Sequence, residues 1–192
     1  MNVYDFDETI FHPDSSYGFF LYCLRHYQRA VLKALPRSAA EGIRYAILPL
    51  RHEKKDAKRL KEALFSYLNR LGDVHGTVSA FWDENADGFA PWYLQQKRKD
   101  DLIISASPAF LLEPAAGKLG VRLIATDMNP YTGKIRGRNC HDEEKARRFR
   151  ETYPDERVEE FYSDSLSDTP MAKLAERAYL VKGGERIPWP YL

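Results

Sequence analysis

The chain has 192 residues, of which 44% are hydrophobic, enough for one buried core and an inserted subdomain. Its 29 basic and 28 acidic side chains nearly cancel, so the charge does not indicate a nucleic-acid partner or an anionic membrane. The two cysteines, Cys23 and Cys140, form no metal-binding or disulfide pattern. With no signal-peptide pattern and no apolar run of the roughly 20 residues that a membrane span needs, we expect a cytoplasmic protein without a transmembrane segment.

The chain begins with a short predicted strand and then changes character. Residues 2–6 are rich in Val, Tyr and Phe and lead into acidic and hydroxyl residues. The following stretch has helical patterns broken by proline and glycine. We predict helices over residues 17–35, 39–50, 56–71 and 74–99. These helices predict a helical insert over residues 13–100 within a core formed by residues 1–12 and 101–192.

From residue 101 onward, short apolar strands alternate with helices. Strands are predicted at 102–104, 121–126 and 158–163, and helices at 108–118, 142–153 and 169–177. Turn residues predict a short hairpin around 129–137 and a terminal hairpin that pairs 178–181 with 185–187. Repeating strand and helix units predict an α/β fold, with a Rossmann-like parallel sheet and helices on both faces.

Polar side chains follow three of the predicted strands. Asp5 and Asp7 follow the first strand, Ser105 the second, and Asp164 the strand over 158–163. Ligands of open parallel sheets bind beyond the carboxyl ends of the strands, so these groups are expected to lie at one edge, within reach of Lys145. Carboxylates about 4 Å apart repel by roughly 4 kcal/mol per pair at an effective dielectric near 20. Such a group requires a cation, and its few oxygen ligands favour Mg²⁺ with a bound phosphate.

These residues meet the demands of phosphoryl transfer. A carboxylate at Asp5 can attack phosphorus and form an aspartyl-phosphate. Asp7 can protonate the leaving oxygen and later deprotonate water, while Ser105 and Lys145 hold the phosphoryl oxygens. Taken alone, the aspartates could instead belong to a turn, and Lys145 could lie on a solvated basic face.

The ordered motifs resemble the haloacid dehalogenase superfamily, in its phosphoserine-phosphatase-like branch. The four matching segments are Asp5–Thr9, Ile103–Pro108, Lys145 and Asp164–Asp168. This resemblance implies a nucleophile at Asp5, an acid/base at Asp7, and Mg²⁺ on the Asp5 side chain, the Asp7 carbonyl and Asp164. It also implies that Asp168 is a supporting carboxylate and that the helical insert closes over the site.

Further segments resemble a bacterial subset that includes C-type phosphatidylglycerophosphate phosphatases: Phe19–Tyr22, Asn139–His141, Tyr162–Ser165 and Tyr179–Val181. The resemblance implies a small phosphorylated substrate, with a lipid phosphate among the candidates. Residues 43–50 offer apolar side chains that could touch a lipid, but they are too few for an anchor.

One residue departs from the family pattern. The usual glycine after the second aspartate is Glu8, so we expect the loop to accept a side chain and an added negative charge that influences substrate choice. Thr9 and Ser107 are further candidates for the substrate side of the site, although Ser107 could instead cap the next helix. The function expected is a phosphatase; a phosphotransferase and a non-catalytic module that binds a phosphorylated ligand are the alternatives.

Overall fold

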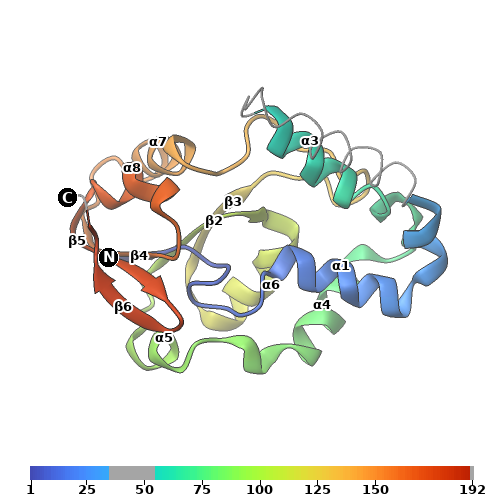
Figure 1. The fold of residues 1–192 in the computed structure, drawn as a ribbon, viewed down its shortest axis with the longest axis horizontal. Helices are drawn as coiled ribbons and strands as arrows, with labels where there is room; N and C mark the ends of the chain where they lie inside the picture. The colour runs from blue at the N-terminus through green and yellow to red at the C-terminus, as the bar shows by residue number, and fades with distance from the viewer. Residues whose placement is uncertain (35–54, 191–192) are drawn as a thin grey trace.

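The protein is described by a computed structural model that covers residues 1–34 and 55–190. Its centre is a six-stranded sheet in the order β3-β2-β1-β4-β5-β6 (Figure 1). Strands β1 to β5 are parallel, and β6 is antiparallel to β5. The strands are β1 Asn2–Tyr4, β2 Leu102–Pro108, β3 Arg122–Thr126, β4 Val158–Ser163, β5 Ala175–Lys182 and β6 Glu185–Pro188. The predicted α/β fold is therefore confirmed.

Helices separate the parallel strands and fill the long connection between β1 and β2. Figure 1 shows α1, α3 and α4 on one side of the molecule, and α7, α8 and both termini on the other. The helices are α1 Ser15–His26, α3 Lys55–Leu64, α4 Val74–Glu84, α5 Pro91–Gln96, α6 Ala109–Leu119, α7 Glu143–Thr152 and α8 Thr169–Ala172. Short 3₁₀ turns occur at Leu68–Arg70, Ala86–Gly88 and Leu166–Asp168.

Helices cover both faces of the sheet, and successive side chains of a strand point to opposite faces. In β1, Val3 packs into a cluster with residues of α7 and α8, such as Phe149. Its neighbour Tyr4 packs into a second cluster with residues of α4 and α6, such as Leu111. The short central strands can be apolar throughout since both faces are covered.

The helices between β1 and β2 share the second of these clusters. Phe19 of α1 lies edge-on to Phe81 of α4, with ring centroids 5.5 Å apart. The indole Nε1 of Trp82 donates a hydrogen bond of 2.6 Å to the carbonyl of Leu111 in α6. The inserted helices are thus anchored to the sheet through α6.

Several element boundaries differ from the sequence predictions. The helix predicted over 17–35 is interrupted at Tyr27, and the one predicted over 74–99 is divided into α4 and α5. The helix predicted over 169–177 ends at Ala172, because Ala175–Arg177 pairs with β4 instead. The helix predicted over 39–50 and the apolar segment 43–50 lie outside the described residues. The terminal hairpin is confirmed by the pairing of β5 with β6.

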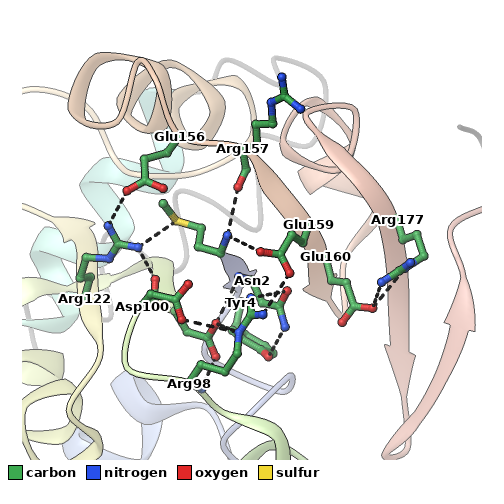
Figure 2. A network of polar contacts seen from close by, with 12 residues as sticks. Asn2, Tyr4, Arg98, Asp100, Arg122, Glu156, Arg157, Glu159, Glu160 and Arg177 are labelled. Carbon is green, nitrogen blue, oxygen red and sulfur yellow. Dashed lines mark hydrogen bonds and ion pairs between the residues drawn. The ribbon is translucent and has the colours of Figure 1, made fainter.

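Ion pairs and hydrogen bonds connect the amino ends of the strands. Arg98, just before β2, donates to Glu159 of β4 at 3.0 Å and to the Asn2 side chain at 3.2 Å. Arg122 of β3 pairs with Glu156 at 3.3 Å. Figure 2 shows these side chains converging around the beginning of β1. The side chains at this edge are engaged in contacts with one another, whereas the carboxyl edge is where ligands of such sheets bind.

No helix in residues 1–34 and 55–190 is both long enough and apolar enough to cross a bilayer.

Candidate active site

Asp5 lies immediately after β1, at the carboxyl edge of the sheet. Its N–H donates a hydrogen bond of 2.8 Å to the carbonyl of Tyr162 in β4, so the backbone stays aligned with the neighbouring strand. Asp164 follows β4, which pairs directly with β1. The parallel alignment therefore brings these two carboxylates to the same edge, as the sequence predicts.

Lys145, in the first turns of α7, lies between two carboxylates. Its Nζ donates hydrogen bonds of 2.7 Å to Asp5 Oδ1 and 2.7 Å to Asp168 Oδ2. The Lys145 side chain is 2% exposed, so it is not part of a solvated basic face. Burial lowers the pKa of Lys145, but the charges of Asp5 and Asp168 outweigh burial and raise it overall. The lysine therefore remains a cation.

Burial raises the pKa of Asp5 to about 7, against the opposing effect of Lys145. Lys145 occupies only the Oδ1 oxygen of this carboxylate. Among the described residues, none donates a hydrogen bond to Oδ2. One oxygen is thus fixed by the lysine, and the other is available to react or to bind a cation.

Asp7 is held at the beginning of α1. The N–H of Ser15 donates to Asp7 Oδ1 at 2.6 Å, and the Ser107 hydroxyl donates to Asp7 Oδ2 at 2.5 Å. The Ser16 hydroxyl lies 2.9 Å from that of Ser107 and extends the cluster. Burial, and then the charge of Asp14, raise the pKa of Asp7 despite these donors. The raised pKa favours the protonated carboxyl, the form that can donate a proton.

Ser107 therefore does not cap α6, whose N-cap position is occupied by Pro108. Its partner Ser105 is buried, and the Ser105 hydroxyl accepts the N–H of Ser107 at 3.0 Å. Both serines lie in the last part of β2, where the register of its pairing with β3 shifts between Ile104 and Pro108. Ser105 therefore lies in the strand that pairs with β1, and Asp5 directly follows β1.

Glu8 adopts the backbone conformation that the family's glycine would favour. Its φ is +56°, in the left-handed region. The Glu8 carboxylate lies 2.8 Å from His12 Nδ1 and accepts the N–H of Asp14 at 3.0 Å. Two contacts within its own loop accompany the unusual backbone angle.

Thr9 and Asp168 fix the loop that follows β4. The fully buried Thr9 hydroxyl accepts the N–H of Asp164 at 2.9 Å. Ser163 donates to Asp168 Oδ2 at 2.7 Å, the same oxygen that Lys145 contacts. Thr9 therefore connects the loop after β1 to the loop after β4. Asp168 is thus hydrogen-bonded to Lys145, and its role as a supporting carboxylate stays a prediction.

Two carboxylates at this edge are candidate ligands for a magnesium ion. Asp5 and Asp164 offer carboxylate oxygens, and the buried Asp168 Oδ1 has no hydrogen-bond partner in the described part of the chain. Residues 1–34 and 55–190 contain no group of three or more His, Cys, Asp or Glu side chains arranged around a common point. Mg²⁺ suits such a sparse set because it retains several waters and shares positions with substrate phosphate.

Three nearby residues were not anticipated from the sequence. From the first turn of α1, the Ser15 N–H reaches Asp7 and the Ser16 hydroxyl reaches Ser107, a placement that the position of Asp14 as N-cap could have indicated. Lys61 of α3 reaches the carbonyl of Ala106 at 2.6 Å. No local signal distinguishes Lys61 from the other lysines of that helix, because only the packing of α3 brings it to the site.

Comparisons with known proteins agree with this fold. Residues 3–173 match the family model of the haloacid dehalogenase-like hydrolases, so the chain belongs to this family. Among curated proteins, none matches the chain.

Two solved structures illustrate the likeness of the fold. A protein of unknown function from Bordetella pertussis Tohama I has a TM-score of 0.75 and 22% identity, with 99% of this chain and 91% of that chain covered. A phosphoserine phosphohydrolase-like protein from Francisella tularensis has a TM-score of 0.55 and 14% identity, covering 96% and 88% of the respective chains. At these identities the likeness shows the shared fold.

Proposed function

We propose that the protein is a Mg²⁺-dependent phosphatase that hydrolyses a phosphate monoester through an aspartyl-phosphate on Asp5. The observation that carries the proposal is the position of Asp5 between Lys145 and the open carboxyl edge. Lys145 holds Oδ1 at 2.7 Å and leaves Oδ2 without a donor among the described residues. A fixed carboxylate with one available oxygen is suited to in-line attack on phosphorus.

In the first step, Asp5 Oδ2 forms a bond to phosphorus as the ester P–O bond breaks. Asp7 transfers its proton to the departing oxygen, which leaves as an alcohol. In the second step, the Asp7 carboxylate takes a proton from water, and the resulting hydroxide attacks phosphorus. Phosphate is released, and the carboxylate of Asp5 is regenerated. Proton transfer of this kind contributes roughly 10²- to 10⁴-fold to the rate.

The remaining residues bind and orient the phosphoryl group. The ammonium of Lys145, fixed by Asp168, balances negative charge on the phosphoryl oxygens, and the Ser105 hydroxyl can donate to one of them. Magnesium would be held by the Asp5 side chain, the Asp7 carbonyl and Asp164. When bound, it supplies further neutralisation of phosphate charge.

We also propose that residues 13–100 act as the cap, with residues 1–12 and 101–192 as the catalytic core. The support is that α1 and α3 bring Ser15, Ser16 and Lys61 to the surroundings of Asp7. A cap in this place would exclude water and contact the part of the substrate that leaves. The sequence resemblance to C-type phosphatidylglycerophosphate phosphatases makes a lipid phosphate one of the substrates to screen.

The proposal is tested by measuring phosphate release from p-nitrophenyl phosphate with and without Mg²⁺. Turnover should require the metal, and Asp5→Asn should lower kcat by roughly 10³-fold or more, since the nucleophile is lost. If the Asp5→Asn variant were as active as the wild-type protein, the assignment of Asp5 as the nucleophile would be refuted. Absence of release by the wild-type protein would favour a non-catalytic binding module, whereas release that depends on an added alcohol would indicate a phosphotransferase.

A further inference from the structure

Lys61 extends from α3 toward the end of β2. Its Nζ donates to the Ala106 carbonyl at 2.6 Å and to Asn139 Oδ1 at 3.3 Å. Thr126 lies beside these two acceptors: its Oγ1 is 2.8 Å from the Ala106 carbonyl oxygen and 2.9 Å from Asn139 Oδ1, and its single proton can be donated to either. The half-buried lysine is therefore held in one place.

Both partners of Lys61 are neutral. An ammonium group has three protons to donate, so two contacts leave one donor unused. Within residues 1–34 and 55–190, no carboxylate lies at ion-pair distance from Lys61. A cation removed from water is costly unless an anion compensates it, which makes this position favourable for an anionic ligand.

The ammonium lies on the Asp7 side of the site. Ala106, its first partner, directly precedes Ser107, whose hydroxyl donates to Asp7. Burial lowers the pKa of Lys61, and the charges of Asp7 and Asp14 act in the opposite direction. In the proposed reaction Asp7 protonates the leaving oxygen, so Lys61 faces the region that the leaving group would occupy.

We infer that Lys61 binds a second anionic group on the substrate, carried by the leaving alcohol close to the ester oxygen. This inference rests on the proposed function for the orientation of the substrate. The anion is a carboxylate or a phosphodiester, both of which accept a hydrogen bond from an ammonium. An esterified alcohol with no second charge would leave the unused donor of Lys61 without an anionic acceptor.

A neighbouring lysine provides a matched control. Lys58 lies one turn earlier on α3, and its Nζ donates to the Gly137 carbonyl at 2.9 Å. Glu62 of the same helix bonds to Lys134 and Ile135. Lys58 thus joins α3 to Gly137, as a purely structural lysine would. Substitution of Lys58 tests this joining role without changing the charge near Asp7.

Binding to the Asp5→Asn variant tests the subsite without turnover. Titration calorimetry would compare O-phosphoserine with O-phosphoethanolamine, which lacks the carboxylate. It would also compare a short-chain phosphatidylglycerophosphate with glycerol 3-phosphate, which lacks the phosphodiester. A charge-assisted contact predicts a preference of about 10- to 100-fold for the doubly anionic member of at least one pair. The pair that shows the preference identifies the anion.

Adding Lys61→Met should reduce that preference to about one, Lys61→Arg should retain most of it, and Lys58→Met should leave it unchanged. A preference that survives Lys61→Met, no preference in either pair, or equal weakening of both members would overturn the inference. These outcomes are separate from a failure of the proposed function, which appears as absent Mg²⁺-dependent turnover of p-nitrophenyl phosphate.

Discussion

At the scale of single residues, Glu8 shows how a departure from a family pattern is accommodated. A side chain in the left-handed region costs roughly 1 kcal/mol more than glycine there. The contacts of Glu8 with His12 and with the N–H of Asp14 offset this cost. Because both contacts lie within one loop, the carboxylate of Glu8 acts on the shape of the loop that carries Asp7.

We predict that Glu8→Gly is more stable than Glu8→Ala by about 1 kcal/mol, because both lose the contacts but only glycine removes the backbone strain. Urea unfolding of the two variants measures this difference. Both variants should lower kcat/KM by the same factor on O-phosphoserine and p-nitrophenyl phosphate. Unequal factors would instead support the expectation from the sequence, that the charge of Glu8 influences substrate choice.

At the scale of elements, α3 packs against the turn that follows β3. Gly133 has a φ of +67°, and a Cβ there would lie 2.5 Å from the carbonyl oxygen of Phe65, the residue after α3. Lys58 and Glu62 make their contacts with the same turn. This close backbone approach positions α3, and with it Lys61, over the site.

Substitution of two glycines separates this contact from backbone strain. Gly120, at the end of α6, has a φ of +70°, and a Cβ there would meet no atom within 4 Å. Gly120→Ala should cost about 1 kcal/mol of unfolding free energy, from its backbone angle alone. Gly133→Ala should cost about 3 kcal/mol, because a steric clash is added. Equal losses in urea unfolding would mean that α3 does not pack against this turn in solution.

At the scale of the whole molecule, the two edges of the sheet have different tasks. The amino edge is closed by Arg98, Arg122 and their acidic partners, as Figure 2 shows. The carboxyl edge carries the proposed catalytic and metal-binding residues Asp5, Ser105 and Asp164. Stability and chemistry can therefore be changed independently.

We predict that Arg98→Met lowers the unfolding free energy by about 1–2 kcal/mol, because the buried carboxylate of Asp101 loses a hydrogen bond from the guanidinium. For a chain of this size the melting temperature should fall by roughly 2–8 °C. Arg177→Met removes an exposed pair with Glu160 and should change little, which makes it the control. A large loss of kcat/KM in Arg98→Met at a temperature where it is folded would contradict the separation of the edges.

The sequence by itself determined the fold class and the strand ends that carry Asp5, Asp7, Ser105 and Asp164. These features are local, since short apolar runs followed by polar residues show where buried strands end. The sheet then places the strand ends together, because parallel strands share one carboxyl edge. Predictions that depended on this local pattern therefore agree with the structure.

Only the tertiary structure decided the features that depend on a distant partner. Residues 175–177 have helix-forming side chains but pair with β4, because the hydrogen bonds between the two strands outweigh a helix propensity of a few tenths of a kcal/mol per residue. The contact of Ser15 with Asp7 and the approach of Lys61 to Ala106 depend on how α1 and α3 pack. Packing between segments far apart in the chain determines such contacts, so a local sequence pattern does not predict them.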